Sequence, residues 1–143
     1  MAYTPISEGA KGWASLINTN FNISVGSVQT AGVVALNGLK VENTLGYQLI
    51  KNGDLTIVST KGVLSGLTTN GLSSTDVASF PTGILSGHED SEVLWGAGLK
   101  NNGSGANQFV NIYRNGDKIA VQTFDAQGAN LVFGIDIWFA YKG

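Results

Sequence analysis

The segment that most constrains the fold is the densest apolar run of the chain, residues 131–141, which reads Leu-Val-Phe-Gly-Ile-Asp-Ile-Trp-Phe-Ala-Tyr. Nine of these eleven residues are apolar or aromatic, and β-branched and aromatic side chains favour a pleated strand over a helix. A strand with one solvated face would alternate apolar with polar residues, whereas only Asp136 interrupts this run. We therefore expect a strand that is covered on both faces, either by the core of a β domain or by a neighbouring subunit.

Glycine content and turn chemistry extend the β prediction to the whole chain. The 143 residues include 20 glycines, which is about twice the usual ~7%, and only 2 prolines. Asn-Gly pairs at 37–38, 52–53 and 115–116 are typical of tight hairpin turns in which both residues take positive φ. We expect an all-β fold, a β-sandwich or jelly roll built from many short strands.

Apolar and β-branched runs between turn residues place the individual strands. The strands are expected at residues 33–36, 39–42, 45–50, 55–60, 61–67, 80–85, 92–99, 108–113, 118–124 and 131–141. The polar tract 68–79 is expected to form a long surface loop, and residues 125–130 are expected to form a turn into the last strand.

A short helix is expected near the N-terminus. Trp13, Ile17 and Phe21 recur at a spacing of four, which places them on one face of a helix over about residues 8–20. A helix this short is marginal alone and needs a partner surface, which is either the β domain or copies of the same helix. We therefore divide the chain into an N-terminal attachment and trimerisation segment, residues 1–26, and a head domain, residues 27–143.

Charge and cysteine content exclude several classes of function. The net charge is −2 and the basic residues form no cluster, which argues against binding to nucleic acid or to an anionic membrane surface. The absence of cysteine excludes disulfides, thiol catalysis and cysteine-based zinc sites. No signal peptide and no transmembrane run is recognisable, so we expect a soluble protein made in the cytoplasm, without membrane insertion.

No catalytic motif is recognisable, and we expect neither enzymatic activity nor a cofactor. The single histidine, His88, lies beside Glu89 and Asp90, but consecutive loop residues point in different directions, so a solvated acidic loop is expected rather than a metal site. A glycosidase pair remains open because its two carboxylates need only converge in space. Asp136 in the apolar run is expected to serve an interface or a buried polar network.

Aromatic and planar polar side chains suggest a ligand with many hydroxyl groups. Trp95, Tyr113 and Tyr47 are candidates to stack on sugar rings, and the low charged fraction of 13% suits a neutral ligand. Trp95 is equally compatible with a place in the core, whereas Trp138 is expected in the core. The ligand-binding residues predicted from the sequence are Trp95, Tyr113, Arg114, His88 and Asp90.

Two terminal motifs resemble a known family. Trp13 followed by Leu16-Ile17-Asn18-Thr19-Asn20-Phe21 resembles the opening of tail-fibre and receptor-binding proteins of tailed bacteriophages. Residues 134–140, Gly-Ile-Asp-Ile-Trp-Phe-Ala, resemble the closing strand of the β-sandwich heads of phage fibres. The resemblance covers about 20 residues at one end and about 10 at the other.

The resemblance implies a non-enzymatic virion protein, a tail-fibre or baseplate component that binds a host cell-surface saccharide. It implies a homotrimer that contacts other virion proteins through the N-terminal segment. The chain lacks the long shaft and repeats of full fibres, so a capsid decoration protein or head fibre remains an alternative. A carbohydrate-binding module of a cellular protein is a third possibility, which the missing signal peptide disfavours.

The trimer prediction also has support in the residues themselves. The predicted helix and the last strand together offer more apolar surface than a single small head can cover, and closed symmetry would cover it. The predicted interface residues are Trp13, Ile17, Phe21, Ile137 and Phe139.

Overall fold

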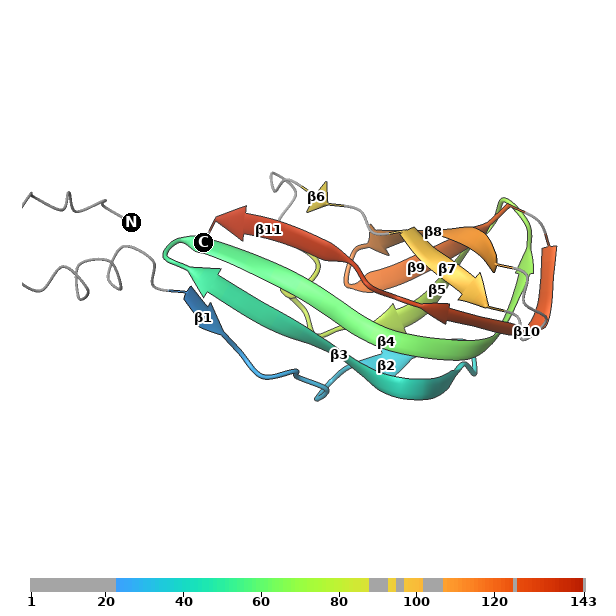
Figure 1. Cartoon of the computed structure of the whole chain (residues 1–143), viewed down its shortest axis with the longest axis horizontal. Helices are drawn as coiled ribbons and strands as arrows, with labels where there is room; N and C mark the ends of the chain where they lie inside the picture. Colours follow the sequence, from blue (N-terminus) through green and yellow to red (C-terminus); the bar gives the residue numbers. More distant parts are fainter. Residues whose placement is uncertain (1–22, 88–92, 95–96, 102–106, 125, 143) are drawn as a thin grey trace, which may run out of the picture.

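The computed structural model describes residues 23–87, 93–94, 97–101, 107–124 and 126–142, and these residues form an all-β fold, as predicted (Figure 1). These residues form no helix, and therefore no helix that is long and apolar enough to cross a membrane. The helix predicted near residues 8–20 lies outside the described residues. The strands are β1 (Ile23–Val25), β2 (Val34–Ala35), β3 (Lys40–Asn52), β4 (Leu55–Asn70), β5 (Ser74–Ser79), β6 (Val93–Leu94), β7 (Ala97–Asn101), β8 (Asn107–Asn115), β9 (Lys118–Thr123), β10 (Ala126–Gly134) and β11 (Trp138–Lys142).

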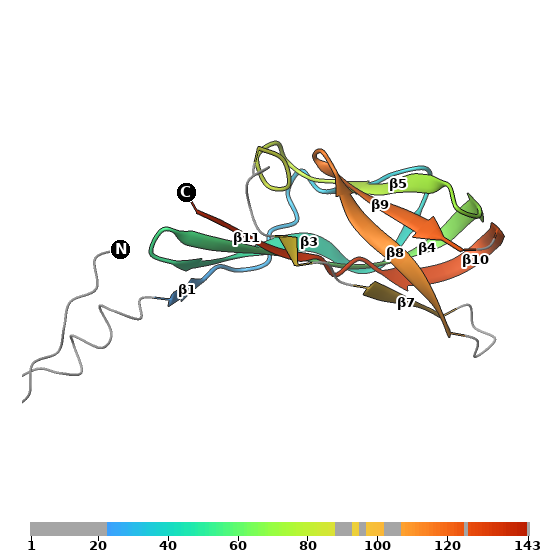
Figure 2. The same ribbon diagram turned by 90° about the horizontal axis from the view of Figure 1, so that it is seen from above.

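The strands form one antiparallel sheet that folds over into two layers. The order is β1-β3-β4-β10-β7-β8-β9-β5-β2, and β11 pairs with the first part of β4, beyond the end of β10. β1, β3, β4, β10 and β11 make the first layer, and β8, β9, β5 and β2 make the second, with β7 joining β10 to β8 (Figure 2). Apolar side chains fill the space between the layers, which is the arrangement of a β-sandwich.

Two long strands run through the first layer where four shorter ones were predicted. The predicted strands at 39–42 and 45–50 merge into β3, and those at 55–60 and 61–67 merge into β4. The register between β3 and β4 shifts on either side of Asn43, so the polar residues between the two predicted strands are accommodated as bulges. Local composition cannot reveal this continuity, because it comes from pairing with an uninterrupted neighbour.

The Asn-Gly turns occur where the sequence predicts them, but with two geometries. Asn37 and Gly38 have φ of 53° and 71°, which is the predicted pattern of two positive values. In the β3–β4 and β8–β9 hairpins the two-residue loops are Gly53–Asp54 and Gly116–Asp117. Only the glycine has positive φ there, 60° in Gly53 and 59° in Gly116, which fits the turn type with glycine in its first position.

The C-terminal apolar run is not one strand. β10 ends at Gly134, β11 begins at Trp138, and the intervening residues bend around the buried side chain of Thr60. The Thr60 hydroxyl donates to the Ile135 carbonyl at 2.6 Å and accepts from the Ile137 amide at 2.9 Å. This bend satisfies backbone groups that a continuous strand would have paired in its ladder.

The second layer contains the main errors of the strand prediction. β5 lies within residues 68–79, which were predicted as a surface loop, and its Val77 is fully buried. Residues 80–85, predicted as a strand, instead form a turn in which the Ile84 amide bonds to the Pro81 carbonyl at 3.1 Å.

In the first layer, two strand boundaries differ from the prediction. β10 begins at Ala126, inside the predicted turn 125–130. β1 already belongs to the sheet, so the described β structure begins upstream of residue 27.

Besides the backbone pairing through β7, side chains of the two layers contact each other, for example at two positions along the sandwich. The hydroxyls of Thr69 on β4 and Thr123 on β9, both buried, lie 2.5 Å apart. Further along, the Arg114 guanidinium of β8 lies 5.4 Å from the ring centroid of Phe139 on β11. The core between them is aliphatic and aromatic, and its largest fully buried side chains are Phe133, Phe139, Leu64, Leu67, Leu85, Ile119, Leu131, Ile135, Ile137, Val58 and Val77.

Candidate functional site

The long axis of the molecule separates two ends with different chemistry. β4 spans 16 residues, which corresponds to roughly 50 Å of extended chain. Ile23, Lys142 and the Gly53–Asp54 turn lie at one end, which we call the terminal end (Figure 1). The turn after Asn70 and the start of β10 at Ala126 lie at the other, which we call the distal end.

The second layer presents a polar outer surface, which we call the distal face. Residues that are directly paired across strands point to the same side of a sheet, and successive residues alternate. Ile112, Ile119 and Val121 point inward to the core, so their neighbours point outward. The distal face therefore consists of Ser74, Asp76, Asn111, Tyr113, Asn115, Lys118 and Gln122, whereas Ala120 lies on the same side but is buried beneath its neighbours.

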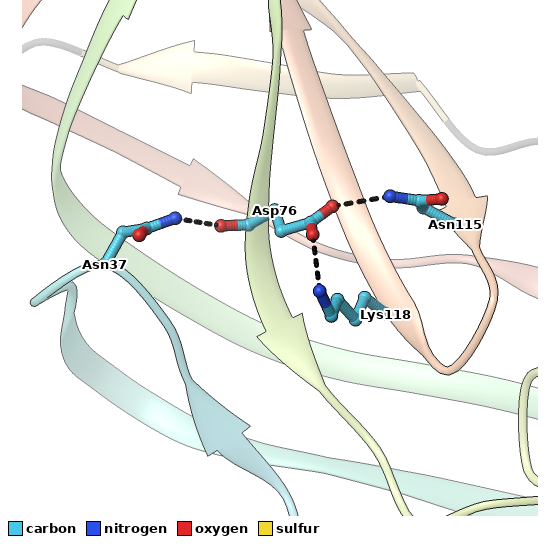
Figure 3. A network of polar contacts seen from close by, with 4 residues as sticks. All are labelled: Asn37, Asp76, Asn115 and Lys118. Atoms are coloured by element: carbon cyan, nitrogen blue, oxygen red, sulfur yellow. Dashed lines mark hydrogen bonds and ion pairs between the residues drawn. The ribbon is translucent and has the colours of Figure 1, made fainter.

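A hydrogen-bonded cluster around Asp76 holds one part of this face in place (Figure 3). The Asp76 carboxylate accepts from the Lys118 ammonium and from the Asn115 amide, each at 2.8 Å. Its backbone carbonyl accepts from the Asn37 side chain, also at 2.8 Å. The hydrogen bond from Lys118, followed by the one from Asn115, holds the pKa of the Asp76 carboxyl below its ordinary value. The Asp76 carboxylate thereby fixes the β8–β9 hairpin to β5, and the Asp76 backbone carbonyl fixes the turn at Asn37 to the same strand.

Tyr113 and Arg114 were both predicted to bind ligand, but they point to opposite sides of β8. Tyr113 is half-buried on the distal face, in the row that it forms with Ala120 and Asp76. Arg114 faces inward, where it donates to the Leu85 carbonyl at 2.8 Å and lies over the ring of Phe139. Arg114 therefore holds the 80–87 turn against the core, and its role in ligand binding stays a prediction from the sequence. Trp95, His88 and Asp90 lie outside the described residues.

Two exposed apolar side chains, which we call the distal tip, lie at the distal end of this face. Phe124 follows β9 and is 80% exposed, and Leu72 in the turn before β5 is 68% exposed. The Leu72 amide donates to the Thr123 carbonyl at 2.8 Å, and the Leu72 carbonyl accepts from the side chain of Gln122. Leu72 also has a φ of 51°, a conformation that strains a non-glycine residue.

Neither residue of the distal tip is among the ligand-binding residues predicted from the sequence. A signal was present for each residue: Asn70-Gly71 is a turn pair immediately before Leu72, and Phe124 ends an alternating strand just before a polar segment. An aromatic residue at a strand end is usually core, so only the structure distinguishes Phe124 from a buried side chain such as Phe133.

The first layer presents a different outer surface at the terminal end, which we call the terminal face. Cross-strand pairs place apolar residues side by side over β11, β4, β3 and β1. Val25 is 61% exposed and Ile23 is 56% exposed. The apolar residues of the terminal face are Ile23, Val25, Ile50, Leu55, Ile57, Trp138 and Ala140, and the polar residues Gln48, Asn52, Ser59 and Lys142 lie around them on the same side of the sheet.

The predicted interface residues of the last strand lie on the other side of β11. Ile137 and Phe139 are each 1% exposed within the single chain, so they are core residues, and no neighbouring subunit can cover them further. Trp138, predicted to be core, is 47% exposed. Alternation along β11 is regular, but the sequence could not show which of its two apolar faces turns inward. Trp13, Ile17 and Phe21 lie outside the described residues.

Asp136 lies in the bend between β10 and β11 and is exposed, which corrects its predicted place in a buried network. Nearby protein atoms still remove part of its hydration and raise the pKa of its carboxyl, although Lys61 opposes this. No hydrogen bond to the Asp136 side chain is observed among the described residues.

Comparisons with known proteins support the fold. No protein-family model matches the sequence, and no curated protein matches it. The structure is similar to the crystal structure of the receptor-binding protein (gp15) of Listeria phage PSA, with a TM-score of 0.58 and 18% sequence identity. The similarity covers 92% of this chain and 72% of that chain. At this identity it shows a shared fold, and any shared function has to be argued from the surfaces described above.

Proposed function

We propose that this chain is a non-enzymatic virion protein of a tailed bacteriophage, a tail-fibre or baseplate component that binds a saccharide on the host cell surface. The observation that carries the proposal is the distal face with its tip, where the side-chain amides of Asn111, Asn115 and Gln122 lie around Tyr113 and lead to the exposed ring of Phe124. The fold of a phage receptor-binding protein and the two terminal motifs support the same role.

The chemistry of the distal face suits a neutral ligand with many hydroxyl groups. Asn111 and Gln122 are directly paired on this face, with 3.5 Å between the Asn111 amide nitrogen and the Gln122 amide oxygen. Planar amides both donate and accept, as sugar hydroxyls do, while an exposed aromatic ring offers an apolar platform for the sugar ring. From the exposed Lys118 to Phe124, the outward side of β9 extends over six residue positions, a span of about 20 Å. This length suits a short oligosaccharide.

A host polysaccharide binding assay with the full chain tests this proposal. Wild-type protein is applied to an array of bacterial surface polysaccharides, beside Phe124→Ala and Asn111→Ala. We expect binding to at least one polysaccharide, a loss of at least about tenfold in Phe124→Ala and a smaller loss in Asn111→Ala. Val41→Ala, which removes an exposed side chain on β3, is the matched control and should bind as wild type. Silence on every saccharide, or binding that ignores Phe124, would overturn the proposal.

The same protein tests the absence of catalysis. After prolonged incubation of the polysaccharide that it binds, mass spectrometry should find no shortened or de-acetylated product. Release of fragments would replace the proposal with a glycosidase or esterase role.

We also propose that the protein assembles as a homotrimer, with the terminal face at the subunit contact. The motivation is an exposed apolar surface that extends over four strands and includes Trp138 and Val25, because such contiguous patches are uncommon on monomers. Closed threefold symmetry would cover it without leaving an open end. The N-terminal segment 1–26 would then join other virion proteins at the terminal end, and the distal face would point away from the virion.

A further inference from the structure

A pocket opens at the terminal end, on the side of the sheet opposite the terminal face. Tyr47, Leu49 and Lys51 alternate along β3 with Ile50, which belongs to the terminal face, so these three residues point the other way. The pocket has a volume of about 380 Å³, which falls within the range of small-molecule sites. Its lining consists of Ser24, Gly26, Ser27, Gln29, Tyr47, Leu49 and Lys51.

Backbone hydrogen bonds fix both walls of this pocket. Gln29 and Tyr47 exchange two of them, from the Gln29 amide at 2.8 Å and from the Tyr47 amide at 3.0 Å. The Gly26 amide donates to the Leu49 carbonyl at 2.9 Å. The approach at Gly46 is so close that a β-carbon there would lie 2.4 Å from the Gln29 carbonyl oxygen. A site whose walls are held in this way loses little entropy when a ligand binds.

The lining combines one aromatic wall, several hydroxyl and amide groups, and one cation. The ring of Tyr47 is oriented by an edge-to-face contact with Phe80, with centroids 6.3 Å apart and planes at 65°. The lining contains no carboxylate side chain. Among the described residues no carboxylate forms a salt bridge with Lys51. The pocket therefore has a local positive charge in a chain whose net charge is −2.

We propose that this pocket binds a small anionic, hydroxyl-bearing molecule about the size of one sugar unit. A carboxylate or phosphate meets the Lys51 ammonium, since an ion pair reinforced by hydrogen bonds is the strongest contact that this lining offers. The hydroxyl groups bond to Ser24, Ser27 and Gln29, and the apolar side of the ring lies on Tyr47. The site uses other residues and another end of the molecule than the distal face, so the inference does not rest on the proposed saccharide receptor.

Nuclear magnetic resonance titration of the full chain tests the inference. The probes are galacturonate, glucose 6-phosphate, inorganic phosphate and neutral glucose, and the observed signals are the backbone amides of residues 24–29 and 46–51. We expect galacturonate, glucose 6-phosphate or both to shift these amides, and glucose to bind at least about tenfold more weakly. The two charged sugars separate a carboxylate site from a phosphate site. Shifts caused equally by inorganic phosphate would indicate a bare anion contact and would overturn the sugar-sized ligand.

Variants decide whether the contact is the proposed one. Lys51→Gln should weaken binding of the charged sugar about tenfold. The matched control Lys61→Gln, an exposed lysine of β4 outside the pocket, should leave the affinity unchanged. Tyr47→Phe should retain binding, and Tyr47→Ala should abolish it. Lys51 is exposed, so Lys51→Gln should fold normally. This variant therefore still tests the site if Tyr47→Ala fails to fold. No amide shift with any probe, or equal affinity in Lys51→Gln, would refute the site.

Discussion

The terminal face and the distal face are built from the same kind of antiparallel sheet, yet apolar side chains make up much more of the terminal face. On the terminal face, residues such as Val25, Ile57 and Trp138 point outward, whereas the distal face presents Asn111, Gln122 and Asp76. Apolar surface gains free energy when it is covered permanently, and polar surface can remain solvated until a ligand arrives. This contrast is the reason for proposing assembly at the terminal end and recognition at the distal end.

Two phenylalanines give the sharpest test of this division, because Phe139 is 1% exposed and Phe124 is 80% exposed. Phe139→Ala leaves a cavity beneath Arg114 and should destabilise the protein by about 3–5 kcal/mol. Phe124→Ala should change stability by less than about 0.5 kcal/mol. Urea unfolding followed by circular dichroism measures both. A comparable loss in the two variants would show that Phe124 is packed against the body of the protein and would break the distinction.

The terminal face predicts a loss of assembly with little loss of folding. Trp138→Glu places a charge in the proposed subunit contact and should convert the trimer to folded monomers. Ser74→Glu, on the distal face, is the control and should remain trimeric. Size-exclusion chromatography with light scattering gives the mass, and circular dichroism gives the fold. A wild-type protein that is already monomeric at micromolar concentration would remove the assembly role of this face.

Only part of the fold that produces these two faces could be predicted from the sequence. The all-β class and the turn at Asn37-Gly38 follow from local chemistry, because an αL conformation at two successive positions strongly favours those residues. β5 could not be predicted in this way. Its sequence, Ser-Thr-Asp-Val-Ala-Ser, is mostly polar, and it is a strand because β9 and β2 pair with its two edges.

The candidate site followed the same pattern. Tyr113 could be proposed from its type and neighbours, and the structure places it on the distal face. Its neighbour Arg114 carries the same kind of signal in the sequence, but the period of two in a strand turns it toward the core. Phe124 and Leu72 were missed because their exposure depends on where two turns meet, at residues that are far apart in sequence.

The Asp76 cluster should make the distal half sensitive to acid. Asp76→Asn removes the ion pair with Lys118 and should cost about 1 kcal/mol at pH 7. The pKa of Asp76 is lowered in the folded state from its ordinary value of 3.8, so its stabilising effect is present above that pH. It disappears as the pH falls through the lower, folded-state pKa. Urea unfolding at several pH values should therefore show the two proteins converging in acid. A difference that does not shrink as the pH falls below 3.8 would contradict this account.

The smallest expected effect concerns Leu72, whose positive φ makes it the most strained apolar residue of the distal tip. Leu72→Asn should stabilise the protein by about 0.5–1 kcal/mol, because asparagine tolerates the left-handed conformation and the lost side chain is 68% exposed. If the tip binds saccharide, the same change should weaken binding severalfold, because the apolar contact is gone. A single substitution would relieve the backbone strain at Leu72, so its presence is consistent with a leucine that is needed for binding. Thermal unfolding and the polysaccharide assay measure the two effects on one sample. A variant that is less stable than wild type would show that packing holds Leu72 in this conformation. The strain at Leu72 would then no longer support a binding function of the distal tip.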